Sequence, residues 1–425
     1  MMRSMFSAIS GLRAHQNWMD VIGNNIANVN TTGFKVGRVR FQDILNQTVK
    51  GAGSPIDGRG GTNPAQIGLG VVVGAIDTIQ TQGALQSTGK FSDMAIQGEG
   101  FFVMSDGANT FYTRDGAFDV GLDGRLVNAS NGMYVMGWQA DDQGVVDTTT
   151  GVNSINIPLG QELDATASVA AIIQGNLKAN APVYDGTDAA TQAATADGRY
   201  SSDVTVVDSL GVEHSITVTF TKTADNTWSY EFSDPADPDV LSFTAGATGS
   251  LAFDAQGRLD AAGSTIAALG VTFPAGAEVG TIATDFTTMT QLASTNTATA
   301  VADGSAAGAL MSFAVNQQGE ILGVYSNGTT KALGQIATAT FANPGGLTKV
   351  GSNMFGTTAN SGEPNMGIPD TGGRGAIANG YLEMSNVDLA EQFTSMIMAE
   401  RGFQANSRVI TTSDEILQDL VNLKR

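Results

Sequence analysis

The C-terminal segment, residues 387–423, reads VDLAEQFTSMIMAERGFQANSRVITTSDEILQDLVNL. Apolar side chains recur in it every seven residues, a spacing that keeps them on one face of an α-helix. Five of them form the main row: Leu389, Met396, Phe403, Ile410 and Leu417. A flanking row adds Phe393, Val409, Ile416, Leu420 and Leu423. The pattern predicts a long amphipathic helix that begins after an N-cap at Asn386, with Asp388 and Glu391 in its first turns.

The N-terminal segment, residues 4–29, carries a shorter version of this stripe and is expected to end as a helix near residues 28–33. Its members are Met5, Ile9, Leu12, Met19, Ile22, Ile26 and Val29. The charge bias is opposite, because residues 1–50 hold six basic and two acidic side chains and residues 380–425 hold seven acidic and four basic. A helix with one apolar stripe needs a surface that covers it. We therefore expect the two terminal helices to pair in the manner of a coiled coil.

The chain between the two helices has the composition of turn-rich β structure, with 53 glycines and only 15% charged residues. Three segments share a Phe, a polar turn that ends in Gly, and an aliphatic residue. Each predicts a β-hairpin with its Gly in the left-handed region: FDVGLDGRL (118–126), FDAQGRL (253–259) and FAVNQQGEI (313–321). Gly-rich tracts at residues 51–64 and 362–375 separate this β structure from the two helices.

Together these features predict a mainly β, multidomain fold with α-helical termini and a nested order. Residues 1–30 and 385–425 form a terminal helical assembly domain, and residues 31–70 and 362–384 form linkers. A core β domain is expected at residues 71–144 and 286–361. A second, outer β domain, residues 145–285, is inserted into it.

Composition disfavours several classes of function. The chain has no cysteine and only two histidines, His15 and His214, so thiol catalysis, a zinc site and a Ser-His-Asp triad are not expected. Residues 141–310 hold 21 acidic and four basic side chains, which repel a phosphate backbone, so no nucleic acid is expected as a partner. No apolar run is long enough to span a membrane, and the N-terminus lacks the pattern of a cleavable signal peptide. Composition alone predicts a cytoplasmic protein.

Two polar loops are candidates for ligand sites. Residues 51–64 are rich in glycine, but they lack the G-K-[ST] ending of a phosphate loop and no predicted strand precedes them. Residues 234–239, DPADPD, offer three carboxylates to a calcium ion, but they contain two prolines and lack the closing Glu. A solvated turn is the better interpretation of the second loop.

Short motifs at both ends and in the first β domain resemble those of the flagellar rod and hook family. They are SGL (10–12), NNIAN (24–28), TGFK (32–35), GEGFF (98–102), YTRDGAF (112–118), GRL (124–126), LEMSNVDL (382–389) and QAN (404–406). The large insertion, with YSNG (325–328) and FANPGGL (341–347), favours a hook-type over a rod-type member. The chain departs from the family pattern at Glu400 and Phe403, where Gln and Tyr are usual.

The resemblance implies a non-enzymatic subunit, with no catalytic, cofactor or metal site, that polymerises into a flexible curved tube and transmits motor torque to the filament. Its implied partners are identical copies, other axial proteins (rod, hook cap and hook–filament junction) and the type III export apparatus. Export through that apparatus needs no cleaved signal, which replaces the cytoplasmic prediction with an extracellular one.

The residues expected to matter fall into two sets. The stripes predict an assembly interface of Met5, Ile9, Leu12, Met19, Ile22, Ile26, Leu389, Phe393, Met396, Phe403, Ile410, Leu417 and Leu420. The resemblance adds the motif residues Asn24, Asn25, Ala27, Asn28, Gly33, Phe34, Ser385, Asn386, Val387, Asp388 and Asn406. Three alternatives stay open at this point: a distal rod subunit, a secreted β-rich adhesin, and a glycan hydrolase with paired carboxylates.

Overall fold

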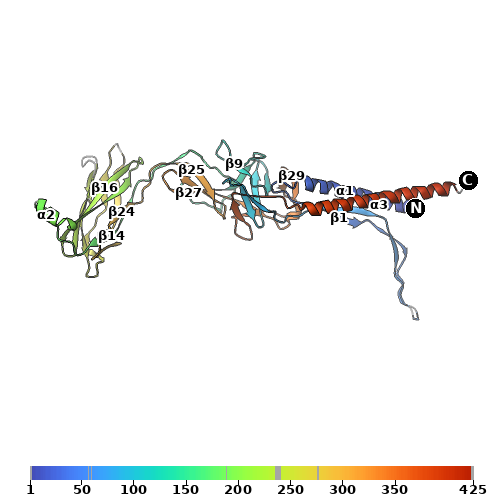
Figure 1. The fold of residues 1–425 in the computed structure, drawn as a ribbon, viewed down its shortest axis with the longest axis horizontal. Coiled ribbons are helices and arrows are strands. Elements are labelled where there is room, and N and C mark those ends of the chain that lie inside the picture. Colours follow the sequence, from blue (N-terminus) through green and yellow to red (C-terminus); the bar gives the residue numbers. More distant parts are fainter. Residues whose placement is uncertain are drawn as a thin grey trace. The chain divides into compact units, whose positions relative to one another are not determined.

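The computed structural model describes residues 2–55, 57–58, 60–187, 189–234, 241–274 and 277–422 (Figure 1). The chain divides into two compact units. Unit 1 comprises residues 1–158, 313–323 and 331–425, and unit 2 comprises residues 159–312 and 324–330. Strands dominate both units, and the long helices lie at the two ends of the chain, so the predicted fold class is confirmed.

The terminal helices are α1, Met2–Ala27, and α3, Leu389–Asn422. Both expected helices are present, but the predicted N-cap of the second is wrong. Asp388 caps α3, since its Oδ1 accepts the backbone N–H groups of Ala390 at 2.8 Å and Glu391 at 3.3 Å. The Asn386 side chain instead makes hydrogen bonds with the backbone of Val36, Ile79 and Thr81. Asp388, the next polar residue, therefore caps the helix.

Unit 1 carries strands from both halves of the chain. Before the insertion they are β1 (Gly37–Asp43), β2 (Asn46–Lys50), β3 (Ala65–Gly68), β4 (Val71–Thr78), β5 (Leu85–Ser87), β6 (Met94–Gln97), β7 (Phe101–Ser105), β8 (Thr110–Thr113), β9 (Phe118–Val120), β10 (Leu126–Asn128), β11 (Tyr134–Gln139) and β12 (Asn153–Ser154). After it they are β27 (Thr330–Ile336), β28 (Thr338–Thr340), β29 (Thr348–Gly351), β30 (Met354–Gly356), β31 (Asn365–Gly367), β32 (Ala376–Asn379) and β33 (Tyr381–Glu383), with a 3₁₀ turn at Pro344–Gly346.

The main sheet of unit 1 interleaves the two halves. Its central order is β27-β11-β7-β8-β30-β29, and β28 also pairs with β7. Aromatic side chains from both halves fill one core, in which the rings of Phe101, Tyr112, Phe341 and Phe355 make edge-to-face contacts. This mutual pairing explains how one β layer can be interrupted by a long insertion and still close around one core.

Unit 2 contains two sheets. Its elements are β13 (Glu162–Leu163), β14 (Ala170–Lys178), α2 (Ala189–Ala194), a 3₁₀ turn (Ala196–Gly198), β15 (Arg199–Val207), β16 (Glu213–Ala224), β17 (Thr227–Ser233), β18 (Ser242–Ala245), β19 (Thr248–Phe253), β20 (Leu259–Thr265), β21 (Leu269–Thr272), β22 (Gly280–Asp285), β23 (Met289–Leu292) and β24 (Thr299–Ala302). One sheet runs β15-β16-β17-β19-β20, and the other is built around β14. Buried residues of both sheets form one cluster around Trp228, Tyr230 and Phe286.

The three predicted hairpins are confirmed. They are β9–β10, β19–β20, and the pair β25 (Gly308–Val315) with β26 (Glu320–Tyr325), within which the chain passes between the two units. The turn glycines Gly124, Gly257 and Gly319 have φ of 75°, 75° and 79°. A side chain there would be strained, which is why Gly recurs at this position of the pattern.

Parts of the expected domain plan differ from the structure. Residues 31–70, expected as a linker, contain β1, β2 and β3, and β1 pairs with β4 beside α1. Unit 2 extends to residue 312, whereas the insertion was expected to end at 285. The reason in both places is pairing between distant strands, which raises no signal in local composition. Residues 235–239 of the acidic loop lie outside the described residues.

Candidate functional site: the terminal helix pair and its junction with the β structure

The two terminal helices lie side by side and antiparallel (Figure 1). Several small residues of the two helices are buried: Ala8, Gly11 and Ala14 on α1, and Ala399 and Ser413 on α3. A Cβ at Gly11 would lie 2.8 Å from Asn406 Nδ2, and a Cβ at Gly402 would lie 2.5 Å from His15 Cε1. The helix backbones therefore approach closely on small side chains rather than on the large apolar ones.

Most of the predicted interface residues are consequently left partly or fully open. Ile22 alone among those described is buried, at 2% exposure. The half-buried ones are Met5, Ile9, Leu12, Met19, Ile26, Met396, Ile410 and Leu417. Leu389, Phe393 and Phe403 are 40%, 51% and 37% exposed. The side chain of Leu420 is outside what the structure describes.

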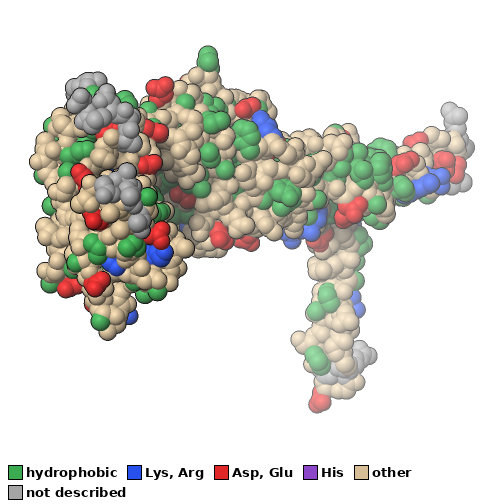
Figure 2. Space-filling model, turned by 60° about the vertical axis from the view of Figure 1, so that its left-hand side comes forward, with side chains coloured by type: hydrophobic (Ala, Val, Ile, Leu, Met, Phe, Trp, Pro, Cys, Tyr) green, Lys and Arg blue, Asp and Glu red, His purple; other side chains and the backbone are tan. Residues whose placement is uncertain are grey.

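Further large apolar side chains, which were not predicted as interface, are exposed on the same helices. They are Phe6 on α1 and Ile397, Met398, Val409, Ile416 and Val421 on α3. The face of unit 1 in Figure 2 shows hydrophobic side chains gathered along the helices. An apolar surface of this extent is typical of a helix that another chain covers.

A side-chain network joins the end of α1 to the start of α3. Asn25 is buried, and its amide donates to Gln392 Oε1 at 3.0 Å and to Gly37 O at 2.8 Å, while its Oδ1 accepts the Gly37 N–H at 2.9 Å. Asn386 Oδ1 accepts the Val36 N–H at 2.8 Å. The backbone after α1 is thus held by both the first and the last parts of the chain.

Three charged side chains are buried directly below this network. Glu383 accepts a hydrogen bond from Lys35 Nζ at 2.5 Å and from an Arg114 guanidinium nitrogen at 3.2 Å. The side chains of Lys35 and Glu383 are fully buried and that of Arg114 is 4% exposed. Burial lowers the pKa of Lys35, and the Glu383 carboxylate opposes that shift. We name Lys35, Arg114 and Glu383 the junction triad.

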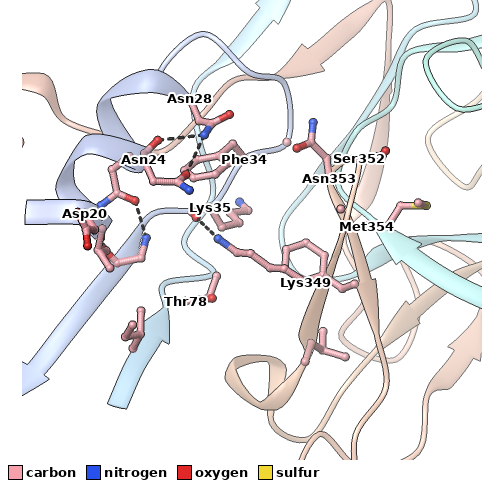
Figure 3. A pocket seen from close by; sticks show the side chains of 18 residues that line it. Asp20, Asn24, Asn28, Phe34, Lys35, Thr78, Lys349, Ser352, Asn353 and Met354 are labelled. Carbon is pink, nitrogen blue, oxygen red and sulfur yellow. Dashed lines mark hydrogen bonds between the residues drawn. The ribbon is translucent and has the colours of Figure 1, made fainter. Parts of the chain in front are cut away.

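A pocket of about 670 Å³ opens beside the junction triad, between the end of α1 and the β29–β30 hairpin (Figure 3). Asp20, Asn24 and Asn28 of α1 and its following turn line one wall, and Asn28 donates to Asn24 O and Oδ1 at 3.0 and 2.9 Å. The other wall carries Lys349, whose Nζ donates to Lys35 O at 3.0 Å and lies 4.6 Å from the centroid of the Phe34 ring.

Comparison with known proteins gives the family. A flagellar hook protein, FlgE, of Borreliella burgdorferi is 41% identical over 450 residues, with both chains covered completely. The chain belongs to the flagellar hook protein family. The FlgE of Treponema pallidum is 40% identical over 469 residues, again with full coverage of both chains.

Four models of this flagellar family match successive parts of the chain. Residues 5–35 match the flagella basal body rod protein, and residues 95–176 match the D1 domain of flagellar hook protein FlgE/F/G. Residues 176–304 match the FlaE D2 domain, and residues 378–423 match the FlgEFG C-terminal segment. A crystal structure of the Helicobacter pylori hook protein FlgE2 has the same fold, with a TM-score of 0.51 at 16% identity, over 70% of this chain and 100% of that one.

The motif residues of this hook-family chain gather at the junction. Gly33, at φ 67°, donates its N–H to Glu383 O at 2.8 Å, and a Cβ there would lie 2.6 Å from Asp115 N. Ser385 Oγ accepts the Val387 N–H at 3.4 Å. Ala27 is exposed, and Asn406 lies apart, in the helix pair.

Sequence reasoning missed the junction triad and Gln392. Lys35, Arg114 and Glu383 stood inside quoted motifs, but they were not singled out, because isolated charged residues are usually at the surface. One signal was available: the motif before the β structure contains Lys35, and the motif after it contains Glu383, which has the opposite charge. No helix among the described residues is long and apolar enough to cross a membrane, and those residues hold no group of three or more His, Cys, Asp or Glu placed to bind a metal.

Proposed function

We propose that this chain is a structural subunit of the flagellar hook, which polymerises with identical copies into a flexible tube that transmits torque. The observation that carries the proposal is the row of exposed apolar side chains on α3, including Phe393 at 51% and Ile397 at 59% exposure. Covering each such side chain contributes roughly 1.5–3 kcal/mol, so many copies packed along their helices resist separation.

The acidic unit 2 suits a surface that has to slide as the tube bends. Contacts between exposed charges are worth about 1 kcal/mol or less each and can rearrange at little cost. Other axial proteins of the rod, cap and junction are proposed to bind at the ends of the tube. The type III export apparatus is proposed to deliver the chain to the cell exterior without a cleaved signal.

The first test replaces the exposed apolar side chains Phe393 and Ile397 by Ser. The monomer should stay folded, because neither side chain is buried, and the critical concentration for polymerisation should rise roughly 10- to 100-fold per residue. Leu210→Ser is the control, because Leu210 is an exposed leucine of unit 2. An unchanged critical concentration in both helix variants, measured by sedimentation, would show that α3 does not carry assembly.

Two deletions extend this test. Removal of residues 385–425 should abolish polymerisation and leave the β structure folded. Removal of residues 159–307, which lie in unit 2, should leave straight tubes that have lost curvature. Tubes from the first variant contradict the assembly role of α3, and loss of all assembly in the second shows that the insertion carries essential contacts.

A distal rod subunit is the second candidate, because two of the matching family models are named for rod proteins. A rod is straight, whereas a hook is curved. Negative-stain imaging of the polymer distinguishes the two: curved or supercoiled tubes support the hook assignment, and uniformly straight tubes support the rod.

A further inference from the structure

The turn between β9 and β10 presents one leucine completely to solvent. Leu122 is 109% exposed. The turn around it is rigid, because Gly121 donates to Arg125 O at 2.8 Å, Gly124 donates to Gly121 O at 2.9 Å, and Ile157 donates to Gly124 O at 2.6 Å. A single exposed leucine needs no explanation by itself. A leucine held out on a fixed turn is, however, already arranged to enter a cavity at no cost in loop ordering.

The pocket beside the junction triad offers such a cavity in the same unit. Val21 and Ile76 give it an apolar wall, and Ile76 is 55% exposed. Lys349 projects into the pocket from the wall that faces α1 (Figure 3). Its ammonium has no carboxylate partner among the described residues, and burial lowers its pKa. Lys349 is exposed, and an exposed cation without a counter-charge gains modestly from an acidic partner.

We propose that the β9–β10 turn of one copy inserts into this pocket of a second copy, with Leu122 against the apolar wall and Asp123 paired with Lys349. This rests on the proposed polymeric function and names one of its contacts. Asp123 Oδ1 accepts the Arg125 N–H at 3.3 Å, and its Oδ2 can pair with another cation, because it lies 3.8 Å from Arg125 Nε in an exposed ion pair of little strength. Asp20, which has the same charge as Asp123, lies on the α1 wall, across the pocket from Lys349 (Figure 3).

The contact is heterologous, because the turn and the pocket are different surfaces of one molecule. Each copy therefore keeps one free turn and one free pocket after pairing. A heterologous contact whose rotation does not close generates an open helical polymer. The acidic turn and the basic wall also set the direction in which copies add.

Cross-linking tests the contact directly, since the chain has no cysteine of its own. One full-length chain carries Leu122→Cys, and a second, distinguished by a size tag, carries Ser352→Cys at the pocket rim. A short bis-maleimide should join the two in mixed polymers and not in dilute monomer. Leu210→Cys in place of Leu122→Cys is the matched control and should give no mixed product.

A charge exchange tests the pairing. Asp123→Lys and Lys349→Asp should each raise the critical concentration about 10-fold, and the two changes combined in one chain should restore it. Leu122→Ser should raise it roughly 10- to 100-fold without changing the unfolding of the monomer. Because Lys349 donates a hydrogen bond to Lys35 O, its variants are compared only where the monomer melts as the unmodified chain does. Leu122→Ser tests the contact without that requirement.

The outcomes separate this inference from the proposed function. If the unmodified chain forms no polymer, the proposed function fails. If polymers form but the mixed cross-link is absent and Leu122→Ser polymerises normally, the function stands and the turn-and-pocket contact is wrong. A cross-link together with a raised critical concentration supports both.

Discussion

Replacement of Glu383 by Gln should destabilise unit 1 by about 3–5 kcal/mol. The substitution preserves the size of the side chain and removes only its charge. Lys35 then remains buried without a counter-charge, and Arg114 keeps only the weaker attraction of Glu99. The carboxylate also accepts the Gly83 N–H at 2.8 Å, and the amide oxygen of glutamine can keep that one bond.

The part of this loss that comes from Lys35 has an upper limit. An uncompensated lysine can lose its proton, which at pH 7 costs about 4.6 kcal/mol for a pKa near 10.4 at 1.36 kcal/mol per unit. The cost is smaller here because burial has already lowered the pKa of Lys35. Arg114 has no such escape, because a guanidinium stays charged. A loss of about 3–5 kcal/mol therefore agrees with both routes.

The loss should also depend on pH. In the variant the folded-state pKa of Lys35 falls further below its unfolded value, so the unfolded chain binds more protons between those two values. Stability then rises with pH across that window. The deficit of Glu383→Gln relative to the unmodified chain should therefore be larger at pH 7 than at pH 9.

Urea unfolding of the monomer measures this. Trp138 is in the core of unit 1 and Trp228 in that of unit 2, so a shared Trp228→Phe background makes tryptophan fluorescence report on unit 1. Glu363→Gln, at an exposed position of unit 1, is the control and should change stability by less than about 0.5 kcal/mol. If Glu383→Gln loses no more stability than this control at pH 7, the Glu383 carboxylate does not offset the buried charges of Lys35 and Arg114, and the reasoning is refuted.

Two further predictions concern the helix pair and unit 2. Gly402→Leu should weaken the helix pair by about 1–3 kcal/mol, because a Cβ there meets His15. Gly23→Leu is the control and should have no such effect, because nothing lies within 4 Å of a Cβ at Gly23. The Trp18 fluorescence of the monomer distinguishes the two variants. Burial acts to raise the pKa of Asp208, but hydrogen bonds from His214 and from the backbone outweigh it and hold that pKa below its ordinary value. The stability that Asp208 contributes is therefore present above about pH 4 and is lost as the pH falls further. Asp208→Asn should reduce the dependence of the unfolding free energy of unit 2 on acid pH. An equal pH dependence in the variant and the unmodified chain would contradict this.

The sequence predicted the helices well because their signal is local. A seven-residue row from Leu389 to Leu417 specifies a helix and its apolar face whatever covers that face. It does not specify the partner. Within the chain the helices approach closely at Gly11 and Gly402, where a Cβ would meet Asn406 and His15 of the other helix. A stripe of large apolar residues predicts that this face of the helix needs a cover, but it does not say whether this chain or a neighbouring one provides it.

The N-cap error has a similar origin. Asn386 and Asp388 are both good capping residues, and local preference does not separate them. Asn386 is engaged elsewhere: its amide donates to Ile79 O at 2.9 Å and to Thr81 O at 3.1 Å. Because these acceptors are some 300 residues away in the chain, only the folded structure decides which of the two residues caps α3.

The junction triad is the part that the sequence could least reveal, and its composition has a physical consequence. Lys35 follows α1, Glu383 precedes α3, and Arg114 belongs to the β structure between them, so one carboxylate ties together three distant segments. An apolar contact of the same size would tolerate rotation of the helices against the β structure. Buried charges tolerate it poorly, because any register that separates them leaves a charge unpaired. The triad therefore fixes the direction in which the helix pair leaves the β structure of unit 1, and with it the orientation in which the apolar rows on α3 would meet a second copy in the proposed polymer.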